Sequence, residues 1–231
     1  MAEQAGTLFV VATPIGNLND ITFRAIETLR NVAVILAEDT RTSRKLLSRY
    51  DIDTPIRSYH QHSRGRKEQD IVAELEGGAD FALVTDAGTP AIADPGGRLV
   101  ELARRSGVPV VPIPGASAVT TALSAVGLGG DQFTFLGFLP HKKGRQKKLD
   151  RLGGMISPVV LYESPHRLEK LLGELAARHP AAQVSAAREI TKKFEDIRVG
   201  TPAELAAHFA VHPPKGEIVA VVRVADKGRQ E

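Results

Sequence analysis

The chain has 231 residues, enough for one large domain or two small ones. Apolar residues make up 42% and charged residues 25%, the proportions of a soluble globular protein with a buried core. The absence of cysteine excludes disulfides and thiolate catalysis and favours a reducing, cytoplasmic compartment. Because the net charge is only +3, the location of the charges matters more than their sum.

The first apolar run, at 8–12, is too short for a secretory signal. The longest uncharged stretch, residues 106–130, is long enough to span a membrane. Prolines at 109, 112 and 114 interrupt it, so we expect no spanning helix and no membrane partner.

Short β-branched runs alternate with helical patterns in the first half of the chain. Strands are expected at 8–12, 32–37, 81–85 and 108–113, and helices at 22–30, 42–50, 67–76 and 97–106. Strands that are apolar nearly throughout are typical of a parallel sheet covered on both faces. The alternation therefore predicts an open α/β sheet.

The second half is less regular. Helices are expected at 118–126, 167–178 and 202–210, and strands at 133–138, 158–163, 184–188, 194–199 and 218–224. Neighbouring strands without long crossovers indicate a mixed sheet. We predict two domains, an N-terminal mostly parallel α/β domain at 1–114 and a C-terminal mixed α+β domain at 115–231.

Loops rich in small residues follow several of the expected strands. The corner at 12–17 lies at the carboxyl end of the first strand, where open α/β sheets bind ligands. A tight turn without function is the alternative there, since the segment lacks the dinucleotide-binding fingerprint. Residues 85–96 read TDAGTPAIADPG and residues 114–118 read PGASA. Small residues let the backbone approach a ligand closely, so the two loops predict one pocket.

Polar residues at the end of the second strand offer two interpretations. Glu38 and Asp39 follow an apolar run, where an acid commonly binds a ribose hydroxyl, but Asp39 is also suited to cap the next helix. That helix has a basic face, which either holds phosphates or is simply solvated. The face consists of Arg41, Arg44, Lys45 and Arg49.

These segments resemble the signatures of the tetrapyrrole-methylase superfamily, the class III S-adenosylmethionine (SAM) methyltransferases. The resemblance is carried by 10–17, 37–41, 85–96 and 114–118. Further along, the sequence reads GFLP at 137–140, YESPHR at 162–167, AREITKK at 187–193 and KGE at 215–217. Together the segments resemble the RsmI branch, which methylates the ribose 2′-hydroxyl of a cytidine in small-subunit (16S) ribosomal RNA. The match extends from Leu8 to Val224.

The resemblance implies a homodimer of two-domain α/β chains with SAM held in the cleft between the domains. Members of this branch often carry an extra C-terminal helical region, whereas this sequence ends soon after its last expected strand. The positions that correspond to SAM contacts are Ile15, Gly88, Thr89, Pro90, Ile92, Gly115, Ser117, Ala118 and Tyr162.

Methyl transfer is an in-line displacement that requires positioning and exclusion of water, and we expect no metal. His60 and His62 have no third ligand nearby in the sequence. A ribose hydroxyl does need a proton acceptor. The candidate acceptors are Glu38, Asp39, Glu163 and Glu189, with Arg167, Arg188 and Lys192 as electrostatic partners. Glu163 is our choice for the base, and an ion pair with Arg167 at i,i+4 is the structural alternative.

Two basic loops, 57–67 and 141–151, are suited to a polyphosphate backbone, or else they are mobile and solvated. The expected RNA contacts are Arg41, Arg44, Lys45, Arg64, Arg66, Lys142, Lys143, Arg145, Lys147 and Lys148. Two other functions stay open. One is a precorrin-type tetrapyrrole C-methyltransferase, and the other is a SAM- or RNA-binding module without catalysis.

Overall fold

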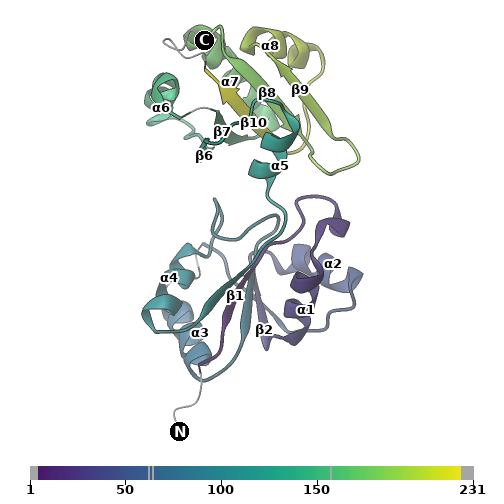
Figure 1. The fold of residues 1–231 in the computed structure, drawn as a ribbon, viewed down its shortest axis with the longest axis vertical. Helices are drawn as coiled ribbons and strands as arrows, with labels where there is room; N and C mark the ends of the chain where they lie inside the picture. The colour runs from purple at the N-terminus through teal and green to yellow at the C-terminus, as the bar shows by residue number, and fades with distance from the viewer. Residues whose placement is uncertain (1–4, 62, 64, 157, 225–231) are drawn as a thin grey trace. The chain divides into compact units, whose positions relative to one another are not determined.

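The computed structural model describes residues 5–61, 63, 65–156 and 158–224. The chain divides into two compact units, unit 1 at Met1–Ser117 and unit 2 at Ala118–Glu231 (Figure 1). Within the described ranges, no helix is long and apolar enough to cross a membrane.

Unit 1 is built on a five-stranded parallel sheet in the order β3-β2-β4-β1-β5. Its strands are β1 (Leu8–Val11), β2 (Val34–Ala37), β3 (Ile56–Ser58), β4 (Phe81–Val84) and β5 (Val110–Ile113). The expected parallel α/β sheet is therefore confirmed. The sequence pattern did not predict β3, because this edge strand has only three residues and a charged one at its centre.

Helices cover both faces of this sheet because successive side chains of a strand point to opposite sides. The helical elements of unit 1 are η1 (Leu18–Asp20), α1 (Phe23–Asn31), α2 (Thr40–Arg49), α3 (Arg66–Glu76) and α4 (Gly97–Arg105). Figure 1 shows α3 and α4 on one side of the sheet and α1 and α2 on the other. Leu36 and Leu83 pack toward α3 and α4, whereas their neighbours Ile35 and Val84 pack toward α1 and α2.

Unit 2 contains a five-stranded mixed sheet in the order β6-β7-β10-β8-β9, as expected. The strands are β6 (Thr134–Phe138), β7 (Val159–Glu163), β8 (Gln183–Arg188), β9 (Asp196–Gly200) and β10 (Ile218–Arg223). Only β6 and β7 pair in parallel, and the other neighbours are antiparallel. The helical elements are α5 (Ala118–Ala125), α6 (Arg145–Asp150), η2 (Leu152–Gly154), α7 (Pro165–Arg178) and α8 (Pro202–Val211).

The core of unit 2 depends on one stripe of α7. Its fully buried residues are Leu168, Leu171, Leu172 and Leu175. They pack against alternate residues of the central strands, such as Leu161 and Ala220. Each buried leucine contributes roughly 1.5–3 kcal/mol to stability. The helix begins at Pro165 rather than Arg167, because proline fits the first turn, where no backbone donor is needed.

Candidate functional site

Three loops of small residues meet at the carboxyl edge of the unit 1 sheet. Thr13, after β1, exchanges backbone hydrogen bonds of 2.9 and 3.0 Å with Gly88, after β4. The Thr13 hydroxyl also donates to the carbonyl oxygen of Thr85 at 3.1 Å. Thr89 Oγ1 donates to the carbonyl oxygen of Ala116, in the loop after β5, at 3.4 Å. The segments that the sequence placed in one pocket are therefore in contact.

Glycine is required where these loops approach most closely. Gly88 has φ +82°, and a Cβ on it would lie 3.4 Å from Ile15 Cγ2. A Cβ on Gly115 would lie 3.0 Å from Ala12 Cβ, which is tighter than ordinary contact. Side chains at these two positions would push the loops apart, so the glycines preserve a cradle with accessible backbone.

The loop between β4 and α4 holds strained backbone. Ala91 and Ala93 have φ 67° and 68°, a left-handed conformation that residues with a Cβ seldom adopt. Such residues persist only where their surroundings hold them, and they cluster in ligand-binding loops. Pro90 in this loop is buried, whereas Ile92 is exposed.

Three SAM candidates remain: Ser117, at the end of unit 1, and Ala118 and Tyr162, in unit 2. Ser117 is the last residue of unit 1 and is half-buried. Ala118 is the first residue of α5. Tyr162 lies on β7, and its ring meets Phe135 and Phe138 edge-on, with centroid distances of 5.0 and 5.5 Å. Tyr162 is thus part of an aromatic cluster within unit 2.

Carboxylates join the ends of β2 and β4. Glu38 Oε2 accepts a hydrogen bond of 2.9 Å from Thr85 Oγ1, and Asp86 Oδ1 accepts one of 3.0 Å from the Asp39 amide. Within the described part of the chain, which excludes His62, no three His, Asp or Glu residues are grouped as metal ligands.

Asp39 caps α2, as the simpler of its two interpretations requires. Its Oδ1 accepts from the Arg41 amide at 2.8 Å, and its Oδ2 pairs with the Arg41 guanidinium at 2.8 Å. The hydrogen bonds from Arg41 lower the pKa of Asp39 to about 2. A carboxylate with so low a pKa is a poor proton acceptor, which weighs against a role as base.

Asp94, which the sequence reasoning did not single out, has a different environment. Burial raises the pKa of Asp94 to about 6, and the nearby charge of Glu38 adds to the effect. A general base needs a pKa close to the working pH, and Asp94 meets that need better than Asp39 does. The local sequence carries no signal for it beyond a second aspartate in the small-residue loop.

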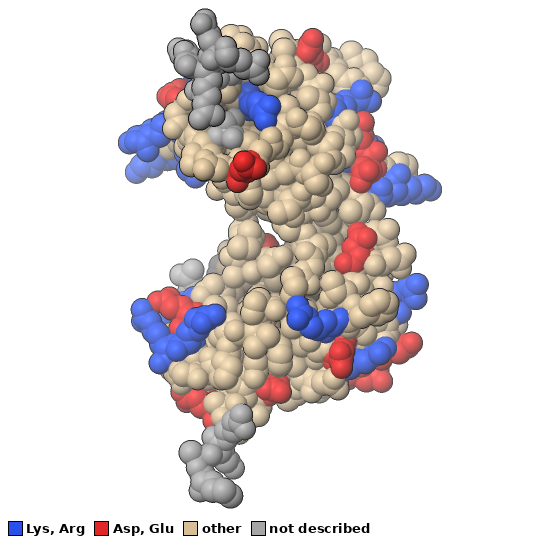
Figure 2. Space-filling view, viewed as in Figure 1, with Lys and Arg blue, Asp and Glu red and all other residues tan. Residues whose placement is uncertain are grey.

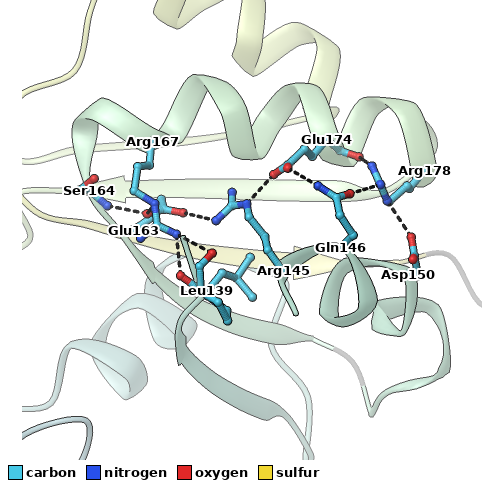
Figure 3. Close-up of polar contacts among 10 residues, drawn as sticks. Leu139, Arg145, Gln146, Asp150, Glu163, Ser164, Arg167, Glu174 and Arg178 are labelled. Atoms are coloured by element: carbon cyan, nitrogen blue, oxygen red, sulfur yellow. Dashed lines mark hydrogen bonds and ion pairs between the residues drawn. The ribbon is translucent and has the colours of Figure 1, made fainter. Parts of the chain in front are cut away.

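In unit 2, Glu163 lies within a buried ion-pair network (Figure 3). Its carboxylate lies 3.2 Å from Arg167 Nε and 3.5 Å from Arg145 Nη1, and it accepts a 3.0 Å hydrogen bond from the Ser164 amide. Its side chain is 0% exposed. These contacts occupy both oxygens from the protein side. They favour the structural alternative, an ion pair with Arg167, over proton abstraction.

The structure corrects the placement of Arg145. We expected it in a basic RNA-binding loop, but it begins the short helix α6 and its side chain is only 2% exposed. Its Nε donates to Glu174 on α7 at 2.8 Å. A guanidinium held in the interior cannot reach an RNA phosphate. The four lysines expected to contact RNA, Lys142, Lys143, Lys147 and Lys148, are exposed or half-buried.

Figure 2 shows Lys and Arg side chains on the side of unit 2 that carries α6. In unit 1, Arg44, Lys45 and Arg66 are exposed, and Arg41 is exposed but paired with Asp39. Arg64 lies outside the described residues.

The AREITKK segment forms a clamp with the KGE segment. Glu189 Oε1 accepts 3.0 Å hydrogen bonds from Lys192 Nζ and from the Glu217 amide. Lys192 Nζ also donates to Glu217 Oε2 at 2.8 Å. Burial opposes ionisation of Glu189, but these donors outweigh it and lower its pKa. A Cβ on Gly216 would collide with the Glu189 carboxylate, so the clamp needs glycine there. Arg188, at the end of β8, donates a hydrogen bond to the Lys215 carbonyl oxygen at 3.4 Å, and its charge contributes to the lowered pKa of Glu189.

Comparison with solved structures extends over both units. A crystal structure of diphthine synthase matches with TM-score 0.75 and 14% identity, covering 94% of this chain and 90% of that one. Uroporphyrin-III-C-methyltransferase from Thermus thermophilus matches with TM-score 0.64 and 20% identity, covering 94% of both chains. At such identities the similarity shows the shared fold.

Sequence comparison is more specific. The family model for Tetrapyrrole (Corrin/Porphyrin) Methylases matches residues 7–206. Ribosomal RNA small subunit methyltransferase I of Mesorhizobium japonicum is 47% identical over 227 residues, which cover 97% of this chain and 77% of that protein. The Bacillus subtilis protein of the same name is 43% identical, covering 94% of this chain and 75% of its own length. The chain therefore belongs to the tetrapyrrole (corrin/porphyrin) methylase family and, within it, to the group of ribosomal RNA small subunit methyltransferase I proteins.

Proposed function

We propose that this protein transfers a methyl group from SAM to the ribose 2′-hydroxyl of a cytidine in small-subunit ribosomal RNA. The carrying observation is the 47% identity to a ribosomal RNA small subunit methyltransferase I over 97% of the chain. That span includes the small-residue loops of unit 1 and the clamp of unit 2. We also propose that the protein is a cytoplasmic homodimer, on the basis of the family resemblance.

The donor cradle in this proposal lies at the carboxyl edge of the unit 1 sheet. SAM supplies a methyl group on a positively charged sulfonium, which makes that carbon electrophilic. Gly88 and Gly115 fit such a ligand, because a Cβ at either position would fill the space where the loops converge. The proposed contacts are Ile15, Gly88, Thr89, Pro90, Ile92, Gly115 and Ser117, with Ala118 and Tyr162 of unit 2 as further candidates.

The proton of the ribose hydroxyl needs an acceptor of suitable basicity. We propose Asp94 for this role. Glu38 accepts a hydrogen bond from the Thr85 hydroxyl and so helps to fix the loop after β4 that carries Asp94. The raised pKa of Asp94 leaves the carboxylate ionised near pH 7.5 and more basic than Asp39. In this proposal the ion pairs of unit 2 stabilise its fold and take no part in proton transfer. These pairs are Glu163–Arg167 and Glu189–Lys192.

Exposed cations supply the proposed affinity for RNA. Neutralising phosphates with Lys and Arg releases counterions and gives binding that weakens with salt. The residues proposed for this role are Arg44, Lys45, Arg66, Lys142, Lys143, Lys147 and Lys148.

The test combines binding and transfer. Calorimetric titration measures SAM affinity, and transfer of tritium from labelled SAM to purified small ribosomal subunits measures activity. Nuclease digestion and mass spectrometry then locate the methyl group. We expect label on the ribose of one cytidine. SAM binding without transfer to subunits would overturn the proposal, and it would favour a tetrapyrrole substrate if a precorrin were methylated, or a binding module if neither were.

A further inference from the structure

A groove of about 550 Å³ lies in unit 2, and all of its lining residues belong to that unit. One wall is formed by 188–198, which links β8 to β9, and the other by 208–215, where α8 ends. The volume is in the range of small-molecule binding sites. The proposed function gives this groove no role.

The backbone of one wall is fixed in a strained form. Glu189 and Thr191 have φ 51° and 67°, so two residues with a Cβ are left-handed within three positions. The clamp of Glu189, Lys192 and Glu217 holds this conformation. Strain of this kind persists where the surroundings impose it, often at binding sites. A wall that is already ordered also lowers the entropy lost on binding.

An aromatic ring lines the groove and faces solvent. Phe194 is 66% exposed, and Lys193 Nζ lies 5.6 Å from its ring centroid. Exposing a phenyl ring to water is unfavourable unless it has a partner. Nucleic-acid bases stack on such rings whatever their identity, since every base has a π-face.

The charges at the groove are unbalanced. Its acids are already paired, with Asp196 at 2.9 Å from Arg198 and Glu189 at 3.0 Å from Lys192. Among the residues that the structure describes, Arg188 and Lys215 have no carboxylate within ion-pair distance. Arg188 donates to the Lys215 carbonyl oxygen and helps to lower the pKa of Glu189, but it is not in an ion pair with that carboxylate. Cations outside ion pairs beside an exposed ring match a phosphate joined to a base better than they match an apolar protein surface.

We propose that this groove binds an unpaired nucleotide of the RNA, with its base stacked on Phe194 and its phosphate at Arg188 and Lys215. The proposal rests on the proposed function, because the occupant belongs to the RNA substrate. The bound nucleotide is a flanking one, and no bond is made or broken at this site. The groove would fix the register of the RNA strand and would require the RNA to be single-stranded at that nucleotide.

The first test measures binding without catalysis. The probe is a fluorescein-labelled oligocytidylate of about ten nucleotides, followed by anisotropy at fixed salt. We expect Phe194→Ala to bind about tenfold more weakly and Phe194→Trp to bind like the wild type, as stacking requires. Phe23→Ala is the matched control, because Phe23 is 93% exposed on α1 of unit 1 and should not change affinity. An abasic oligomer of the same length should bind wild type and Phe194→Ala equally.

The second variant tests the phosphate contact. Arg188→Gln should lower the slope of log affinity against log salt by about 0.7, the value for one phosphate of a single strand. An unchanged affinity in Phe194→Ala, or no binding of the oligocytidylate by the wild type, would overturn the proposal. So would a Phe194→Ala variant that loses self-association in sedimentation velocity but keeps its RNA affinity, since the ring would then belong to a protein interface.

Failure of this proposal is distinguishable from failure of the proposed function. If the wild type methylates small subunits and Phe194→Ala does so with unchanged KM, the groove assignment fails and the function stands. If the oligocytidylate binds through Phe194 but no methyl group is transferred to subunits, the function fails and the groove stands. SAM affinity and thermal unfolding of each variant verify that it is folded.

Discussion

Glu163 and Arg145 form an ion pair in the interior of unit 2, with 3.5 Å between Glu163 Oε2 and Arg145 Nη1 (Figure 3). Arg145 also pairs with Glu174, and Glu163 also pairs with Arg167. Arg167 Nη2 in turn donates to the Leu139 carbonyl oxygen at 2.6 Å. The network therefore joins α6, β7, α7 and the GFLP segment. It also leaves one nitrogen, Arg145 Nη2, without a hydrogen-bond partner among the described residues.

Removing the charge of Glu163 should destabilise unit 2. Glu163→Gln removes one of the two carboxylates paired with the buried Arg145 and the one paired with Arg167, while Glu174 stays 2.8 Å from Arg145. Because Glu174 still compensates Arg145, the cost should be at the lower end of the range for breaking a buried pair, about 3 kcal/mol. Urea unfolding measures the loss. Glu169→Gln is the control, since Glu169 lies exposed on α7, the helix that carries Arg167 and Glu174. If Glu163→Gln instead keeps wild-type stability and SAM affinity but loses single-turnover methylation, Glu163 is the base and the structural interpretation is wrong.

The raised pKa of Asp94 predicts how the free energy of unfolding depends on pH. The pKa of Asp94 in the folded protein is about 6, above the usual aspartate value of 3.8, so the folded protein binds the proton more tightly than the unfolded chain. The ionised carboxyl therefore destabilises the fold as pH rises from about 4 to 6. Asp94→Asn removes this effect and should gain on the order of 1 kcal/mol above pH 6, because solvent screens a half-buried group.

Thermal unfolding of wild type and Asp94→Asn between pH 4 and 8 measures that difference. The two melting temperatures should coincide near pH 4 and separate as pH rises, with the variant higher. A separation that stays constant over this range would show that the carboxyl is not perturbed in the folded protein.

Asp94 should also govern the pH dependence of methyl transfer. If it accepts the ribose proton, the single-turnover rate rises with pH to a plateau above about pH 6, as the carboxyl ionises. Asp94→Asn should lower the plateau by roughly 10²–10⁴-fold and abolish the pH dependence. Asp53→Asn, an exposed aspartate of unit 1, should keep the wild-type profile. A wild-type pH–rate profile in Asp94→Asn would show that Asp94 is not the base and would favour Glu38.

Cations around α6 should set the salt dependence of RNA binding. Replacing Lys142, Lys143, Lys147 and Lys148 together by Gln should reduce the slope of log affinity against log salt by about 3, if each contacts one phosphate of a single strand. Arg145 is left in place because it is buried. Replacing Arg44 and Lys45 gives a comparison in unit 1. An unchanged slope would mean that the α6 surface is merely solvated.

Periodicity in the sequence predicted both sheets except for the strand β3. Apolar runs such as the one at β4, and the leucine stripe of α7, are local patterns that survive in the structure because burial demands them. The strand β3 has no such pattern. Its central residue, Arg57, pairs with Glu74 at 2.6 Å and lies 5.4 Å from the centroid of the Phe81 ring, contacts that only the folded chain supplies.

The site was less predictable, because long-range contacts decide it. Six cations within 141–151 indicate a surface, yet Arg145 turns inward to carboxylates at 163 and 174. Likewise, the pKa of Asp94 is raised by burial and, in addition, by the charge of Glu38, which follows another strand, β2. Loop convergence was easier to predict, since the carboxyl ends of parallel strands lie at one edge and small residues mark close approach.

Gly88 offers the sharpest test of the donor cradle. Gly88→Ala adds a Cβ at φ +82°, 3.4 Å from Ile15 Cγ2, whereas Gly107→Ala adds one at φ +74° with no atom within 4 Å in the described structure. Both variants should lose roughly 1 kcal/mol of stability from left-handed strain. Only Gly88→Ala should weaken SAM binding, by at least about tenfold, since its methyl group enters the cradle. Calorimetry with each variant decides the matter. Equal SAM affinities would place the ligand away from Gly88 and remove this edge of the sheet as the donor site.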